Sequence, residues 1–124
     1  MERYTDKIVM ITGAGDVALA IAERMLGEGA RIAFTDFSET ALTAAVNEMT
    51  ASGFGEDRVM TVQCDVRSQD ACAAAVTAIT ARWSRIDTMV ATAGIIRHLP
   101  IDQMSEKDWQ DVIDINLSGV FRAC

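Results

Sequence analysis

The sequence predicts an α/β protein in which helices cover both faces of a parallel β-sheet. Short apolar runs of strand length alternate with longer segments whose apolar residues repeat at helical spacing. The apolar runs end in glycine or aspartate, which are common turn residues. Such alternation is typical of a parallel sheet, because each right-handed crossover helix returns the chain beside the preceding strand.

The chain of 124 residues is long enough for a single domain, 1–124, with one core. Half of its residues are apolar, and the net charge is -7 with no basic run. This charge disfavours binding to nucleic acid or to an anionic membrane surface, and no apolar stretch reaches the length of a membrane span. The amino terminus carries charges in place of the apolar core of a signal peptide, so we expect a cytoplasmic protein.

The first half of the chain predicts two strands, each followed by a helix. Residues 7–12 (KIVMIT) form an apolar run closed by glycine, as expected for a strand buried on both faces. A helix is expected over 17–28, where a glycine follows. Residues 31–36 (RIAFTD) are the second strand, and Ser38 is placed to cap a second helix that reaches Ser52.

The second half predicts two more strands and two more helices. Residues 58–65 (RVMTVQCD) alternate towards a third strand, and Ser68 is a plausible cap for an alanine-rich helix. Residues 86–94 (IDTMVATAG) supply the fourth strand, and 105–124 are expected to form one long amphipathic helix. The residues expected on its apolar face are Trp109, Val112, Ile113, Asn116, Leu117, Val120 and Phe121.

The turn after the first strand has the outline of a phosphate site. Gly13 and Gly15 allow a tight turn and the close approach of a ligand, and the helix that follows presents free N–H groups to a phosphate. Alternatively, the two glycines only serve the turn. Asp16 adds a second alternative, since its carboxylate can cap the helix and place negative charge where a pyrophosphate would lie.

Two aspartates follow the next two strands. Asp36 stands where a carboxylate can accept hydrogen bonds from both hydroxyls of an adenosine ribose. Its charge would repel a 2′-phosphate, and no lysine or arginine follows it in FSET, so the pattern favours a cofactor without that phosphate. Asp65 can accept a hydrogen bond from an adenine amino group while Val66 packs against the ring. Alternatively, Asp36 is a turn residue at the end of its strand, and Asp65 is a turn or helix-capping residue.

Other common catalytic sites find no support. The three cysteines have no C-x-x-C spacing and His98 is the single histidine, so we expect reduced thiols and no metal site. The only tyrosine, Tyr4, has no lysine four residues later, and His98 is expected to be a solvated loop residue. The chain therefore lacks a candidate general acid held beside a cation.

Taken together, ITGAG, FTDF, CDV, ATAGI and DINLSGVF resemble the short-chain dehydrogenase/reductase family, from about Lys7 to the end of the chain. The resemblance implies a three-layer Rossmann fold, the cofactor NAD, a small alcohol or carbonyl substrate and a homo-oligomer. It implies cofactor binding by Gly13, Gly15, Asp16, Val17, Asp36, Phe37, Asp65, Val66, Ala93 and Gly94. It also implies that Asn116 is the helix asparagine that helps to organise a proton-relay water. The alternative is an asparagine on the apolar helix face whose hydrogen bonds are only structural.

The sequence departs from the family pattern in three places. The glycine loop is one residue shorter, so that Asp16 and Ala18 stand where glycines are usual, and the methyl group of Ala18 is expected to weaken cofactor binding. Ala91 and Thr92 replace two asparagines, which is expected to remove a side chain that ties the central strands together. The family's catalytic serine and Tyr-x-x-x-Lys lie beyond Cys124, so we expect a domain truncated after about four strands.

Two functions from different classes follow. The preferred one is the cofactor-binding portion of an NAD-dependent oxidoreductase, in which hydride transfer requires that the missing serine, tyrosine and lysine be supplied. The alternative is a non-enzymatic nucleotide-binding or protein-interaction module. With the strand order 3-2-1-4, the fourth strand would be an open edge and the last helix would expose Trp109 or Phe121. Such a surface is expected to pair in a dimer, recruit a partner or aggregate.

Overall fold

A four-stranded parallel sheet forms the centre of the fold in a computed structural model, which describes all of residues 1–124. The strands are β1 (Ile8–Thr12), β2 (Arg31–Asp36), β3 (Val59–Gln63) and β4 (Thr88–Ala91). They lie in the order β3-β2-β1-β4, and each neighbouring pair is parallel. The predicted doubly wound order is confirmed, and β4 lies at an edge of the sheet. β3 and β4 are shorter than expected, since each strand begins later and ends earlier than the predicted run.

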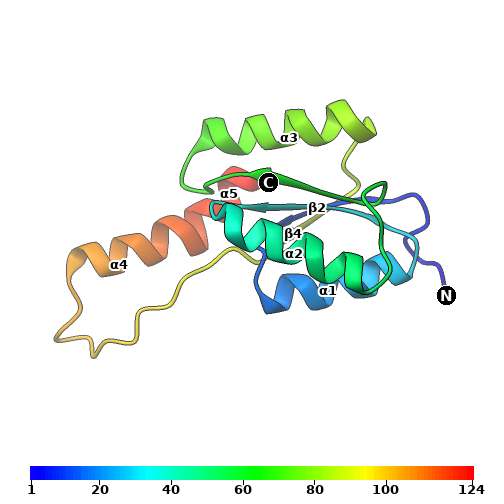
Figure 1. The fold of residues 1–124 in the computed structure, drawn as a ribbon. Coiled ribbons are helices and arrows are strands. Elements are labelled where there is room, and N and C mark those ends of the chain that lie inside the picture. Colours follow the sequence, from blue (N-terminus) through cyan, green and yellow to red (C-terminus); the bar gives the residue numbers. More distant parts are fainter.

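Helices cover both faces of this sheet, which confirms the three-layer prediction (Figure 1). The helices α1 (Asp16–Gly27) and α2 (Glu39–Ala51) lie on one side, and α3 (Gln69–Trp83) lies on the other. The two predicted serine caps are present. The Ser38 hydroxyl accepts a hydrogen bond from the Ala41 N–H at 3.2 Å, and the Ser68 hydroxyl accepts one from the Ala71 N–H at 3.1 Å.

The core is divided by the sheet into two apolar clusters. Val9 and Ile11 of β1 pack with the buried residues of α1 and α2, whereas Ile8 and Met10 pack with those of α3. Successive side chains of a strand point to opposite faces, so one continuous apolar run serves both clusters. The run of β1 is fully buried, as its composition predicted.

The last helical segment is not one regular α-helix, which corrects the prediction for 105–124. It consists of α4 (Glu106–Ile113), a π-helical turn η1 (Asp114–Ser118) and α5 (Gly119–Ala123). The Arg122 guanidinium donates to the Asp114 carbonyl oxygen at 3.1 Å and to its carboxylate at 2.6 Å, which stabilises the wider turn. Sequence periodicity does not distinguish such a turn from ordinary helix, since π-turns are short and rare.

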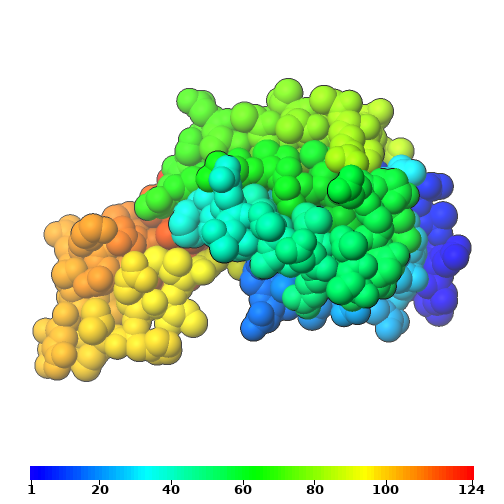
Figure 2. All heavy atoms as spheres, viewed as in Figure 1, coloured from blue at the N-terminus to red at the C-terminus, as the bar shows by residue number.

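The predicted apolar face of this segment is largely exposed. Trp109, Leu117 and Phe121 are 55%, 65% and 81% exposed, respectively, whereas the small residues Gly119 and Ala123 are buried. Figure 2 shows that α4 and the chain before it, in orange and yellow, project from the rest of the molecule. None of the helices combines the length and apolar character that a bilayer crossing requires.

Candidate functional site

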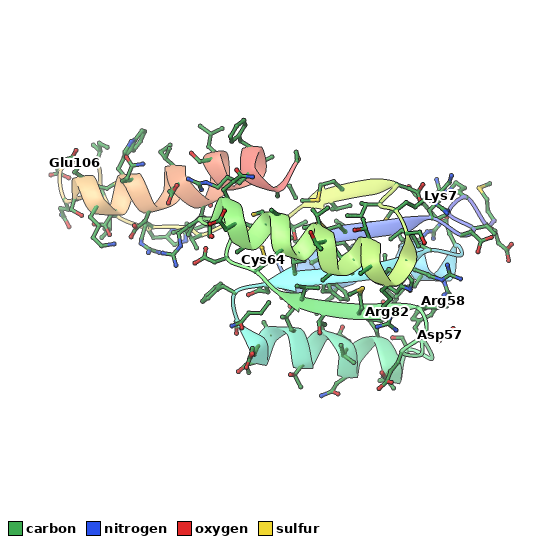
Figure 3. All side chains as sticks on the ribbon, turned by 90° about the horizontal axis from the view of Figure 1, so that it is seen from above. Lys7, Asp57, Arg58, Cys64, Arg82 and Glu106 are labelled. Atoms are coloured by element: carbon green, nitrogen blue, oxygen red, sulfur yellow. The ribbon has the colours of Figure 1, made fainter.

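A cavity of about 350 Å³ lies at the carboxyl ends of the four strands. Its lining includes seven of the predicted cofactor residues: Gly13, Asp36, Phe37, Asp65, Val66, Ala93 and Gly94. Ligands of parallel sheets bind at this edge, and the volume is within the range of small-molecule sites. In Figure 3, Cys64, which also lines the cavity, marks this end of β3, while Asp57 and Arg58 mark the opposite end.

The two predicted glycines have different roles in the turn after β1. Gly13 has a φ of +88°, and a Cβ there would lie 3.0 Å from both the Ala93 nitrogen and the Thr92 hydroxyl oxygen. Glycine is therefore required by both the backbone conformation and the close approach of the chain after β4. Gly15 has an ordinary φ of -86°, and a Cβ there would meet no atom within 4 Å. The space beside Gly15 is open.

The first turn of α1 is uncapped by any side chain. Gly15 is its N-cap residue and offers no side-chain acceptor, while Asp16 and Val17 are exposed and lie outside the cavity lining. The alternative that Asp16 caps the helix is wrong, because Asp16 is already the first helical residue. The first N–H groups of α1 are left for solvent or a ligand.

The methyl group of Ala18 does not reach the open side of the turn. Ala18 is 1% exposed and packs in the cluster that contains Val9 and Ile11. The expected clash between this methyl group and a cofactor is therefore not supported.

The Asp36 carboxylate is fixed at the cavity wall by two backbone groups. One oxygen accepts a hydrogen bond from the Ala14 N–H at 3.0 Å, and the other accepts one from the Ser38 N–H at 2.8 Å. A carboxylate has about four acceptor positions, so each oxygen retains capacity for another donor. The side chain joins the turn after β1 to the start of α2 and presents negative charge to the cavity.

The Asp65 carboxylate is bound by its neighbour Arg67. The Arg67 Nη2 and Nε atoms lie 2.6 Å from Oδ2 and 3.0 Å from Oδ1, and the Arg67 backbone N–H donates to Oδ1 at 2.9 Å. The hydrogen bonds from the guanidinium are the main cause that holds the pKa of Asp65 below its ordinary value. Arg67 itself lines the cavity, which the sequence analysis missed.

The outer rim of the cavity carries further charges that the sequence did not reveal. Arg97 lies 3.7 Å from a carboxylate oxygen of Asp108 and 3.8 Å from one of Asp111. Arg97, Asp111 and Ile115 all line the cavity. These three residues come from the loop after β4 and from the helix that follows, so their meeting depends on how that loop folds back. No local sequence signal identifies them as neighbours.

Asn116 joins the last helical segment to the chain after β4. Its Oδ1 accepts a hydrogen bond from the Ile95 N–H at 2.8 Å, and its Nδ2 donates to the Ile95 carbonyl at 2.9 Å. Gly94 allows this contact, because a Cβ at that position would lie 3.3 Å from Asn116 Oδ1. Asn116 does not line the cavity, and its part in a proton relay stays a prediction.

The expected loss of a tie between the central strands is wrong. The Thr92 hydroxyl donates to the Thr12 carbonyl at 2.7 Å, and the Thr92 N–H donates to the same oxygen at 2.9 Å. The end of β4 is therefore tied to the end of β1 by a threonine in place of the family's asparagine. A hydroxyl donor is sufficient for this bond.

The buried cysteines are not arranged as nucleophiles. The sulfur atoms of Cys64 and Cys72 lie 3.9 Å apart, and burial raises the pKa of Cys64 to about 12. A thiol with such a pKa is neutral near pH 7 and is a poor nucleophile. No group of three histidine, cysteine, aspartate or glutamate side chains is placed to bind a metal ion.

The comparisons with known proteins agree with this geometry. The sequence pattern of the family described as short chain dehydrogenase matches residues 7–124. D-threitol dehydrogenase of Mycolicibacterium smegmatis is 37% identical over 98% of this chain, which corresponds to 46% of that protein. The chain thus spans about half the length of the curated relatives it matches.

Solved structures give the same result. The crystal structure of a short chain dehydrogenase from Mycobacterium smegmatis has a TM-score of 0.91 and 30% identity, covering 99% of this chain and 51% of that one. An actinorhodin polyketide ketoreductase structure with NADPH has a TM-score of 0.88 and 30% identity, covering 97% of this chain and 46% of that one. Both similarities extend over nearly the whole fold described above.

Proposed function

The chain belongs to the short-chain dehydrogenase family, and we propose that it forms the cofactor-binding portion of an NAD-dependent oxidoreductase. The observation that carries the proposal is the position of Asp36, a charged acceptor fixed on the cavity wall at the end of β2. Two hydroxyls on adjacent ribose carbons match the two oxygens, each of which has spare acceptor capacity. The non-enzymatic alternative has no support from the named relatives, which are reductases and dehydrogenases.

The residues around the cavity fit the parts of a dinucleotide in order. The adenosine half would lie in the cavity, with the ribose at Asp36 and the base between Val66 and the chain at Ala93. The diphosphate would lie over Gly15, where there is open space and where the first N–H groups of α1 have no side-chain partner. When bound, NAD would supply or accept a hydride at its nicotinamide ring.

The proposed reaction is hydride transfer between NAD(H) and a small alcohol or carbonyl compound. Asn116, through its two bonds to Ile95, would hold the chain after β4 in place beside the cofactor. The family's tyrosine and lysine have no counterpart in the sequence, where Tyr4 is the only tyrosine. The reaction is therefore proposed only for a protein in which the serine, tyrosine and lysine are supplied.

A homo-oligomer is proposed as well. The last helical segment carries three large apolar side chains that are exposed: Trp109, Leu117 and Phe121. Surfaces of this kind are usually covered by another protein surface. A second copy of the chain would cover it symmetrically.

A calorimetric titration of the purified chain with NADH tests the cofactor proposal. We expect saturable binding at micromolar concentrations. Absence of binding at millimolar NADH would overturn the proposal and favour the interaction module. The control is reduced nicotinamide mononucleotide, which lacks the adenosine half and is expected to bind far more weakly.

The choice of NAD is tested by replacing Asp36 with alanine. We expect NADH affinity to fall by about 10-fold or more, since hydrogen bonds to a charged group contribute about 1.5–3 kcal/mol. NADPH affinity is expected to be retained or to rise, because the variant no longer repels a 2′-phosphate. The variant also loses the hydrogen bonds from Asp36 to Ala14 and Ser38, and any structural effect of that loss weakens the binding of both cofactors equally. The quantity to measure is therefore the ratio of the NADH and NADPH affinities. An unchanged ratio would contradict the assignment.

A further inference from the structure

Arg122 is a charged residue to which the proposed reaction gives no role. It lies in α5, and its side chain is only 21% exposed. Its guanidinium donates to the Val66 carbonyl at 3.1 Å, to the Asp114 carbonyl at 3.1 Å and to the Asp114 carboxylate at 2.6 Å. One side chain therefore joins the chain after β3 to the first residue of the π-helical turn η1.

Val66 is held against α5 by both its backbone and its side chain. Arg122 binds its carbonyl oxygen, and the backbone of Gly119 approaches its side chain so closely that a Cβ there would lie 2.8 Å from a methyl carbon. Val66 is buried and lines the cavity. The position of α5 therefore fixes the cavity wall formed by the chain after β3.

The same wide turn also reaches the chain after β4. Ile115 lines the cavity, and Asn116 binds both backbone groups of Ile95, which is another lining residue. Because β3 and β4 are the two edge strands, η1 connects chains that leave opposite edges of the sheet. Arg122 attaches the turn to one cavity wall and Asn116 attaches it to the other.

The chemistry of arginine suits this attachment. A guanidinium is planar and presents several N–H donors in a fixed geometry, so it can bind two carbonyls and a carboxylate at the same time. The bond to the Asp114 carboxylate is charge-assisted and is therefore the strongest of the three. Without these bonds, the wide turn would lose its connection to the chain after β3.

We propose that Arg122 is a positioning residue for the cofactor site, and that it sets the separation of the two cavity walls through the wide turn and Asn116. The inference rests on the proposed function in one respect, since it takes the ligand of the cavity to be NAD. Arg122 does not line the cavity, so it acts on the ligand only through Val66 and Ile95. An arginine that merely stabilised α5 would have no effect on Ile95.

Hydrogen exchange of the Ile95 amide tests the path from Arg122 through Asn116. In Arg122→Ala we expect this amide to exchange about fivefold faster or more, because a charge-assisted hydrogen bond that holds the turn is lost. The amides of β1 should keep their protection. In an Asn116→Ala background, the same substitution should change the Ile95 rate by less than about twofold, because coupled substitutions are not additive.

A second variant with a smaller change protects the test against loss of the fold. Asp114→Asn keeps an acceptor for Arg122 but removes its charge, and charge-assisted hydrogen bonds are about twice as strong as neutral ones. The Ile95 amide should exchange faster than in the unsubstituted chain but more slowly than in Arg122→Ala. This increase, too, should disappear when Asn116 is replaced by alanine.

The affinity for NADH is the functional readout. The apparent affinity falls with the fraction of molecules in which both walls are correctly placed, so Arg122→Ala should weaken NADH binding by about 3- to 10-fold. The double variant with Asn116→Ala should lose less than the product of the two single losses. Calorimetric titration of the four proteins measures both quantities.

The matched control is Arg85→Ala. Arg85 also binds a backbone carbonyl and a carboxylate, donating to Asp6 at 2.6 Å and to Asp87 at 3.0 Å. Asp87 accepts a hydrogen bond from the N–H of Ile8, the first residue of β1, so this cluster lies at the end of the sheet opposite the cavity. The control should change neither the exchange of Ile95 nor the affinity for NADH.

Three results would overturn the proposal. The first is an unchanged Ile95 rate in Arg122→Ala, or in Asp114→Asn if Arg122→Ala loses the protection of β1. The second is an increase of the same size with and without Asn116. The third is faster exchange of Ile95 with unchanged NADH affinity. If NADH does not bind to the unsubstituted chain, the proposed function fails, and the Ile95 rates still decide whether Arg122 acts through the wide turn.

Discussion

Gly13 and Gly15 stand two residues apart in one turn, but only Gly13 has a backbone conformation that favours glycine. At Gly13 a methyl group would meet the Ala93 backbone, whereas at Gly15 it would enter open space. Motif inspection treats the two positions as equivalent. The stability of the fold therefore depends on glycine at Gly13, whereas glycine at Gly15 leaves open space for a ligand.

Gly13→Ala should therefore destabilise the protein, by about 1–3 kcal/mol, the cost of a non-glycine residue in a sparsely populated conformation. Gly15→Ala should leave the free energy of unfolding unchanged within about 0.5 kcal/mol, but it should weaken the binding of NADH. Urea denaturation and NADH titration of both variants check this. Equal losses of stability in the two variants would show that the turn requires glycine at Gly15 as well, which would contradict this assignment.

Glu28 is a charged residue that the fold buries at the end of α1. The Arg3 Nη2 atom and the Arg24 Nε atom each lie 2.7 Å from its Oε1. The side-chain hydrogen bonds from Arg3 are the largest cause that lowers the pKa of Glu28 from 4.5 to about 2, and those from Arg24 add to them. The ion pair between Arg3 and Glu28 joins the amino-terminal segment to the end of α1.

The pKa of Glu28 predicts a pH dependence. A lowered carboxyl pKa stabilises the fold above the unfolded value, and this stabilisation is lost as the pH falls from about 4.5 towards about 2. Glu28→Gln should be less stable than the unsubstituted chain at neutral pH and should show a smaller loss on acidification. Urea denaturation at a series of pH values measures it, with the exposed Glu48→Gln as the control. Parallel pH curves for Glu28→Gln and the unsubstituted chain would contradict the assignment.

At the scale of elements, one amide connects the last helical segment with the chain after β4. Asn116 binds both backbone groups of Ile95, which has no other element to pair with beyond the end of β4. The contact fixes a long loop that lines the cavity. Its strength should determine how much that loop opens.

Replacing Asn116 with alanine should raise the hydrogen-exchange rate of the Ile95 amide by about tenfold or more, because two hydrogen bonds of about 0.5–1.5 kcal/mol each are lost. Asn116→Asp keeps the acceptor for the Ile95 N–H and should have an intermediate effect. Amides of β1 should keep their protection in both variants. Gln110→Ala, an exposed position on α4, is the control, and the same increase there would point to general loosening of the helix.

For the whole molecule, the exposed apolar surface of the last helical segment predicts self-association. Phe121→Glu should weaken dimerisation by about 30-fold or more, as expected for loss of a central apolar contact of about 2 kcal/mol. Sedimentation velocity over a range of concentrations measures it. Val76→Glu, at a partly exposed position on α3, is the control. A monomeric unsubstituted chain at all concentrations would contradict the oligomer.

The fold was largely predictable because its signals are local. The apolar runs, the serine caps at Ser38 and Ser68 and the glycine after β1 each act within a few residues, and alternation then determines the parallel order. The carboxyl ends of the strands were predictable for the same reason. Most of the expected cofactor residues line the one cavity at these strand ends.

The remainder depended on contacts between distant segments. Arg97 and Asp111 meet only because the loop after β4 folds back. The environment of Asp65 was missed although Arg67 is two residues away, because the sequence does not say whether a carboxylate turns to its neighbour or to a ligand. The tie between β4 and β1 was missed because the Thr92 hydroxyl donates the hydrogen bond that was expected from an asparagine amide.

The wide turn at Asp114–Ser118 has a consequence for how that segment tolerates change. A π-turn holds one residue more than an α-helical turn, because its hydrogen bonds join residues five apart instead of four. Deleting one residue there would therefore leave an ordinary α-helix, with the halves on either side close to their present rotational phase. Gly119 would stay against Val66, where even one added carbon would come within 2.8 Å of a methyl group. The segment should thus tolerate the loss of a residue in the wide turn far better than the gain of a side chain at Gly119.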